Sequence, residues 1–166
     1  MIEDQHAQPG LRRLAREIAL RILFFYETGE SRSAEEAFHL FRRHFDPDQD
    51  EDRVLECDAE QYEQALPYVQ DLFFGVISHL EEIDRRLNEA SENWRLDRMT
   101  RVDRNVMRLA LYEMLYRTDI PLKVSINEAI DLGKDFGSED SGSFINGVLD
   151  NIHQRILSQA EGARKE

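Results

Sequence analysis

The sequence lacks the features of a membrane-embedded, secreted or disulfide-stabilised protein. It has no apolar run of the roughly 18 residues that a membrane-spanning helix needs. The N-terminal stretch MIEDQHAQPG has neither the basic start nor the apolar segment of a secretion signal. Its single cysteine, Cys57, cannot form an internal disulfide, and acidic neighbours disfavour its thiolate. We therefore expect a cytoplasmic protein in which Cys57 is not a nucleophile.

The motifs of common enzyme classes are also missing. The sequence contains no GxGxxG, no Walker loop, no CxxC pair and no Gly-x-Ser-x-Gly elbow. The best competing pattern is a metal site, because Glu36-x-x-His39 and Asp150-x-x-His153 each place a carboxylate one helical turn from an imidazole, as di-iron bundles do. Glu36 is already expected to cap a helix, however, and two further inward glutamates cannot be identified. We expect no catalytic residue, no metal and no cofactor.

The formal net charge is −13, which at first argues against binding of nucleic acid, because a phosphate backbone repels such a surface. The charge is unevenly distributed, however. Residues 46–64 hold nine acidic residues and one basic residue, so this segment alone carries −8. Two arginine-rich stretches, residues 12–21 and 95–108, carry the opposite sign. Local surfaces that suit RNA are therefore compatible with the acidic total.

Apolar residues recur at spacings of three and four along most of the chain, and no segment reads convincingly as a strand. With 166 residues, 41% of them apolar, the chain can form one domain or two small subdomains that share a core. We predict an all-α fold, a compact bundle of about seven helices in two subdomains, about 11–77 and 79–157. Residues 1–10 are expected to be flexible and residues 158–166 to be a frayed tail. The expected helices span about 11–29, 33–45, 59–77, 79–91, 100–117, 125–136 and 141–157.

Local signals define several helix ends. The segments 33–36 and 125–128 both fit capping boxes, in which a serine hydroxyl and a glutamate carboxylate bond free amides at the helix start. Pro67 is expected to kink the third helix or to move its start later. The acidic segment 46–58 is expected to be a mobile linker.

The last helix contains Asn146-Gly147, a pair that is typical of a tight turn. Its neighbours Ile145, Val148 and Leu149 nevertheless recur at helical spacing. Glycine costs about 1 kcal/mol of helix propensity relative to alanine. We therefore expect another helix to cross closely at Gly147.

The most distinctive part of the sequence is RVDRNVMRLALYEMLYRTDIPLKVSINEAIDLGKDFGSEDSGSFINGVLDNI, residues 101–152. It contains an Arg-Leu-Ala-Leu-Tyr-Glu helix, an Asp-Ile-Pro break, an Ile-Asn-Glu-Ala helix and then Phe-Ile-Asn-Gly-Val-Leu-Asp. RRLAREIALRILFFYE near the N-terminus and NWRLDRM before the fifth helix add to the pattern. In these motifs and their order the sequence resembles the NusB transcription antitermination family over most of residues 11–157.

This resemblance implies an all-helical fold of two subdomains and a non-enzymatic RNA-binding protein. It further implies binding of the single-stranded boxA element in ribosomal RNA leader transcripts. The implied protein partner is the small-subunit ribosomal protein NusE, within an RNA polymerase complex that prevents premature termination. The sequence does not decide whether the free protein forms a homodimer. It also leaves the alternative of a protein-interaction bundle that does not bind RNA.

The resemblance places the RNA-binding residues at the starts of the first and last helices. Single-stranded RNA needs cations for its phosphates and an aromatic plane for an unstacked base, and both are present here. Each residue type also has an ordinary structural role: arginines often form a solvated helix face, Asp140 or Ser141 suits an N-cap, and a phenylalanine often lies in a core. The residues that map onto the family's RNA site are Arg12, Arg13, Arg16, Asp140, Ser141 and Phe144.

The candidate partner-binding residues are Arg101, Asp103 and Arg104. The arginines of residues 95–108 could equally form surface ion pairs with acidic neighbours in the same segment. Because the first helix carries few consecutive basic residues, we expect the isolated chain to bind RNA weakly. A basic protein partner would add cationic surface, so we expect the heterodimer to be the binding unit.

Overall fold

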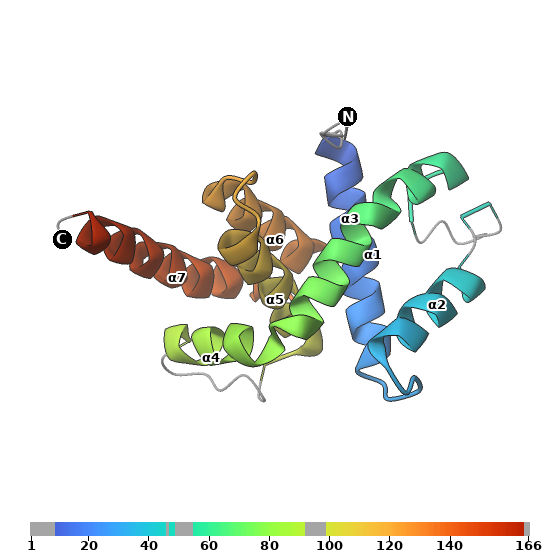
Figure 1. The fold of residues 1–166 in the computed structure, drawn as a ribbon, viewed down its shortest axis with the longest axis horizontal. Coiled ribbons are helices and arrows are strands. Elements are labelled where there is room, and N and C mark those ends of the chain that lie inside the picture. The colour runs from blue at the N-terminus through green and yellow to red at the C-terminus, as the bar shows by residue number, and fades with distance from the viewer. Residues whose placement is uncertain (1–8, 46, 49–54, 92–98, 165–166) are drawn as a thin grey trace. The chain divides into compact units, whose positions relative to one another are not determined.

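A computed structural model describes residues 9–45, 47–48, 55–91 and 99–164 (Figure 1). Within these ranges the regular secondary structure is entirely helical, which confirms the predicted all-α fold of seven helices. The chain divides into two compact units, residues 1–77 and 78–166, and each is described by itself. The helices are α1 (Pro9–Tyr26), α2 (Ala34–His44), α3 (Ala59–Ser78), α4 (Leu80–Ala90), α5 (Arg101–Tyr116), α6 (Leu122–Phe136) and α7 (Ser141–Ala163).

The predicted capping box at the start of α2 is confirmed. The Ser33 hydroxyl accepts a hydrogen bond from the Glu36 backbone N–H at 3.1 Å. The Glu36 carboxylate reaches back and accepts from the Arg32 N–H at 2.6 Å, one residue before the cap. Two amides at the helix start are therefore satisfied by side chains, as the spacing of the residues predicts.

The start of α3 has a reciprocal cap that the sequence analysis missed. The Gln61 N–H donates to the Asp58 carboxylate at 2.8 Å, and the Asp58 N–H donates to the Gln61 side chain at 3.1 Å. Leu55, three residues earlier, is buried. Residues 55–58 therefore belong to the folded first unit, which corrects the expectation of a mobile linker there. The rest of that expectation, at residue 46 and residues 49–54, lies outside the described residues, as do residues 1–8 of the predicted flexible segment.

Pro67 lies inside α3, which is continuous from Ala59 to Ser78.

Two predicted helix ends were wrong. The helix α6 begins at Leu122 directly after Pro121, so Ser125 lies inside the helix and is buried rather than capping it. Proline has a preset φ and no N–H to satisfy, which suits the start of a helix better than the serine three residues later. At the C-terminus α7 continues to Ala163, whereas the sequence predicts its end near Leu157.

Aromatic rings form the centre of the first unit. Phe73 of α3 is fully buried, and its ring lies 6.5 Å from that of Phe38 in α2 and 6.1 Å from that of Tyr26 in α1. Phe38 also contacts Phe74 at 5.5 Å between ring centroids. The three helices of this unit are therefore joined through one aromatic cluster, whose edge-to-face and offset contacts stabilise it beyond the burial of apolar area.

The second unit has an aliphatic core and a partly buried ion pair that joins two of its helices. Leu109 and Leu111 of α5 and Ile145 and Leu149 of α7 are almost fully buried. The Arg108 guanidinium binds the Asp84 carboxylate with two hydrogen bonds of 2.8 Å, which join α5 to α4. Paired, parallel bonds of this kind are the strongest geometry for an arginine and a carboxylate.

Candidate nucleic-acid interface

The three predicted arginines of α1 differ in their exposure. Arg13 is exposed and Arg12 is half-buried. Arg16 is only 3% exposed, and its guanidinium lies over the Tyr68 ring of α3, 5.9 Å from the centroid. A cation at this distance from an aromatic face is attracted by the ring. Arg16 therefore has a packing role in the first unit, and Arg12 and Arg13 retain the surface expected of phosphate-binding residues.

The first turn of α7 brings together the other predicted residues. Asp140 occupies the N-cap position and is exposed, but its side chain makes no capping hydrogen bond. Phe144 follows one helical turn later, is half-buried, and donates its backbone N–H to the Asp140 carbonyl at 3.1 Å. Asp140 was thus correctly placed at the cap, but its carboxylate is not used for capping. The Phe144 ring is neither sealed in the core nor fully in water.

Ser141 is the first residue of α7 and is 1% exposed. Its hydroxyl accepts a hydrogen bond from the Ser138 N–H at 2.9 Å and lies 3.3 Å from the Ser138 hydroxyl. The Ser141 N–H donates in turn to the Ser138 carbonyl at 3.1 Å. The residue therefore closes the turn between α6 and α7, and its direct contact with RNA stays a prediction.

The predicted close helix crossing at Gly147 was wrong. A Cβ atom added at this exposed glycine would meet nothing within 4 Å. The close contacts occur instead at three other glycines around the turn between α6 and α7. At Gly133, for example, an added Cβ would lie 2.4 Å from the Ile145 side chain. The signal in the sequence was the clustering of Gly133, Gly137 and Gly142 beside the turn, rather than the Asn-Gly pair.

The candidate partner-binding residues lie at the start of α5. Arg101 is exposed and Arg104 is half-buried, whereas Asp103 is only 7% exposed. The Asp103 N–H donates to the Thr100 hydroxyl at 3.1 Å, which caps the helix. Of the other arginines in this stretch, Arg108 forms an ion pair with Asp84 of α4. The suggested ion pairs with acidic neighbours within the stretch stay a prediction.

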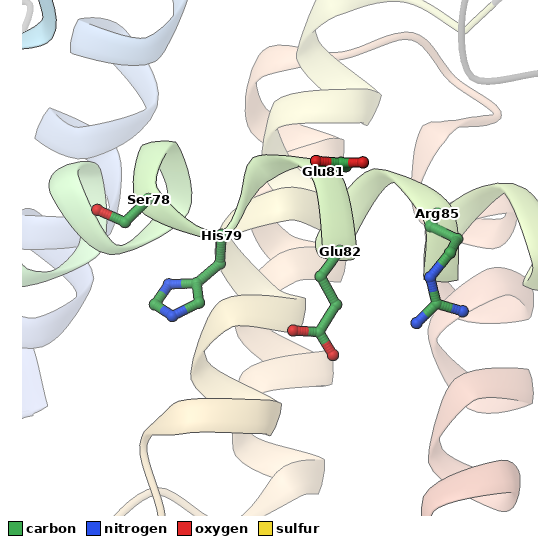
Figure 2. Close-up of a pocket in the computed structure, with 5 residues that line it drawn as sticks. All are labelled: Ser78, His79, Glu81, Glu82 and Arg85. Carbon is green, nitrogen blue, oxygen red and sulfur yellow. The ribbon is translucent and has the colours of Figure 1, made fainter.

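A further polar cluster lies at the start of α4, where the sequence analysis predicted no site. An open pocket of about 370 Å³ is lined by five residues, of which His79, Glu82 and Arg85 extend from the same side of the ribbon (Figure 2). The His79 and Tyr116 rings lie against each other with 4.0 Å between centroids and a tilt of 32°, and the Tyr116 hydroxyl donates to Glu82 at 2.5 Å. This hydrogen bond lowers the pKa of Glu82, helped by the Arg86 guanidinium, and it raises the pKa of Tyr116.

Among the described residues there is no group of three or more histidine, cysteine or acidic side chains that could hold a metal ion. The carboxylate of Glu36, which the di-iron alternative would need, caps α2 instead. In the part of the chain that the structure covers, no helix combines the length and the apolar character needed to cross a membrane.

The all-helical fold and the α6–α7 turn define the chain as a small helical protein with a candidate binding surface at the start of its last helix. Its sequence matches the NusB family over residues 13–154. The transcription antitermination protein NusB of Desulfitobacterium hafniense (strain DSM 10664 / DCB-2) is 44% identical to it over 151 residues, which are 90% of this chain and 93% of that protein. The chain belongs to the NusB family.

Solved structures agree with this assignment. T. maritima NusB superposes with a TM-score of 0.58 at 37% sequence identity, over 86% of this chain and 90% of that one. A second structure contains the antitermination factors NusB and NusE in complex with double-stranded RNA. It superposes with a TM-score of 0.67 at 23% identity, over 89% of this chain and 99% of that one. At this lower identity the likeness shows the shared fold.

Proposed function

We propose that the protein is a transcription antitermination factor that binds single-stranded boxA-type RNA together with the ribosomal protein NusE. The relatives that establish its family are transcription antitermination proteins. A protein of the same fold occurs in a complex with NusE and RNA. Membership of this family, rather than the absence of any motif, also supports a non-enzymatic role.

The observation that carries this proposal is the first turn of α7, where Asp140 and Phe144 lie four residues apart with exposed surface. A half-buried ring suits base stacking, because one face can be packed while an edge or face stays open to an unstacked base. A carboxylate that makes no capping bond can accept from a base amino group or a 2′-hydroxyl. The amino end of a 23-residue helix adds free amides and partial positive charge.

The arginines of α1 supply the sequence-independent part of binding. Arg12 and Arg13 contact phosphates in this proposal, and Arg16 supports them through its packing on Tyr68. Two surface arginines on a chain of net charge −13 make a weak electrostatic site. The expected binding unit is therefore the heterodimer with NusE, and Arg101, Asp103 and Arg104 are its proposed contact residues on this chain.

The proposed cellular setting follows from the RNA that the protein is proposed to bind. A factor that binds nascent ribosomal RNA acts in the cytoplasm, on an RNA polymerase complex that it protects from premature termination.

Sedimentation of the free chain, with and without NusE, tests whether the free chain forms the homodimer that the sequence analysis left undecided. A dimer of the free chain that dissociates when NusE is added would support competition between the two assemblies.

Fluorescence anisotropy with a labelled boxA strand and a scrambled strand tests the function. The wild-type chain with NusE is expected to prefer boxA, and its affinity should fall as salt rises. Equal affinity for the two strands would contradict the proposal and favour a protein-interaction bundle. The same measurement without NusE shows how much the partner contributes.

Substitution of the ring tests the site itself. Phe144→Ala should weaken boxA binding by about 1–3 kcal/mol, the usual value of one base stack, without loss of helicity by circular dichroism. Tyr116→Ala removes another partly exposed ring of the same unit, far from α7's first turn in sequence, and should leave the affinity unchanged. Loss of folding in Phe144→Ala would instead identify the ring as a core residue.

A further inference from the structure

Residues 133–145 form a closely packed corner between α6 and α7. At Gly137 an added Cβ atom would lie 2.3 Å from the Ser141 hydroxyl oxygen and 2.6 Å from the Gly133 carbonyl oxygen. The φ of Gly137 is −97°, which any residue can adopt. Glycine is therefore required at this position for space and not for backbone conformation.

Two further glycines of the corner, one on each helix, also have close neighbours. An added Cβ at Gly142 would lie 3.1 Å from the Lys134 side chain, and one at Gly133 would meet Ile145. The buried hydroxyl of Ser141 holds the intervening turn through the N–H of Ser138. Close contacts at three glycines and one partly buried hydrogen bond thus hold the start of α7 on the end of α6.

The fixed residues flank the surface that we assign to RNA. Asp140 immediately precedes Ser141, and Phe144 follows it by three residues, so the backbone positions of both depend on the placement of the serine. We infer that Gly137 and Ser141 are positioning residues: they set the placement of the Asp140 carboxylate and the Phe144 ring without contacting RNA themselves. This inference rests on the proposed function, and it replaces direct contact as the role of Ser141.

A double-mutant cycle tests the inference, with boxA affinity measured in the presence of NusE. Ser141→Ala should lower the affinity of the wild-type chain about three- to tenfold, the range expected when one hydrogen bond is lost. In a background that already carries Asp140→Ala and Phe144→Ala, the same change should have less than about a twofold effect, because the residues through which it acts are gone. Ser158→Ala is the matched control, since its hydroxyl also bonds backbone in α7 but lies far from the turn.

Gly137→Ala provides a second variant, with Gly162→Ala as its control because an added Cβ there meets nothing within 4 Å. Gly137→Ala should reduce boxA affinity at least as much as Ser141→Ala, and Gly162→Ala should not reduce it. If circular dichroism shows that Gly137→Ala does not fold, the double-mutant cycle on Ser141 alone tests the inference.

Two different results would overturn the inference, and they have different meanings. If the wild-type chain prefers boxA but the Ser141→Ala loss persists in the doubly substituted background, Ser141 contacts RNA directly and only this inference fails. If the wild-type chain shows no preference for boxA over the scrambled strand, the proposed function fails and the inference fails with it.

Discussion

The two units of the protein are stabilised in different ways. The first unit joins its three helices through aromatic rings around Phe73. The second unit depends on close backbone approach at glycines and on the pairing of Arg108 with Asp84. A contact that a single added methyl group would block tolerates little increase in side-chain volume. The proposed base-stacking ring lies in the unit that holds these close glycine contacts.

The largest effect is expected at the centre of the aromatic cluster. Phe73→Ala should lower the free energy of unfolding by about 3–5 kcal/mol, because it leaves a cavity in a fully buried site. Urea denaturation measures this loss. Phe24→Ala is the matched control, since that ring is 41% exposed and its removal should cost less than about 1 kcal/mol. Equal losses in the two variants would show that the cluster does not hold the first unit together.

Loss of the ion pair should have the next largest effect. The Arg108 side chain is 10% exposed and that of Asp84 is 25% exposed, so Arg108→Ala should cost about 2–3 kcal/mol, below the value for a fully buried pair. The exposed Arg85–Glu89 pair within α4 is the control, and Arg85→Ala should cost less than about 0.5 kcal/mol. Urea denaturation of both variants makes the comparison. A smaller loss for Arg108→Ala than for Arg85→Ala would contradict this account of the second unit.

Tyr62 offers a pH-dependent test of the first unit. Burial raises the pKa of Tyr62 to about 12, from the ordinary value of 10.0. A raised pKa means that stability is fully present below pH 10 and falls as the unfolded chain ionises first, between pH 10 and about 12. The contribution of this one group to the slope is at most about 1.4 kcal/mol per pH unit.

Tyr62→Phe should remove that part of the alkaline decline, as measured by urea denaturation at several pH values. At neutral pH it should not lower stability, because the buried hydroxyl has no hydrogen-bond partner among the described residues and its removal relieves a desolvation cost. An unchanged alkaline slope in the variant would place the titrating group elsewhere.

The smallest effect is expected at the exposed glycine of α7. Gly147→Ala should stabilise the protein by roughly 0.5–1 kcal/mol, because it raises helix propensity and meets no neighbour. Gly133→Ala should instead destabilise it by about 1–3 kcal/mol, since its Cβ would overlap the Ile145 side chain. Thermal unfolding of the two variants gives the signs, and the same sign for both would contradict the packing described at the corner.

Local patterns in the sequence were sufficient for the helices and for the cap at Ser33. They failed at Ser125, where a capping-box pattern lies inside a helix that Pro121 starts earlier. They also missed the reciprocal cap of Asp58 and Gln61, because the predicted boundary between linker and helix falls between the two residues. A cap pattern is ambiguous on its own, because a stronger start signal upstream, here Pro121, can leave the serine inside the helix.

The candidate site was predictable only in part. The resemblance of residues 101–152 to the NusB family located Asp140 and Phe144, and the structure places both on the surface of one helical turn. Arg16 is buried with its guanidinium over the ring of Tyr68, a residue of another helix. The arginine-rich stretch around Arg16 does not predict this contact. Sequence patterns identify residue types near a site, but they do not show which of them reach its surface.

The sequence by itself determined the helical class of the protein, the order of its helices and its family, because periodicity and short motifs depend on neighbouring residues. Only the tertiary structure decided that Gly137 lies at a close contact and Gly147 does not, that Ser141 is buried, and that Arg108 binds Asp84. Each of these depends on an element that lies elsewhere along the chain or across a turn. Such contacts arise only when the helices pack, and a local pattern cannot contain them.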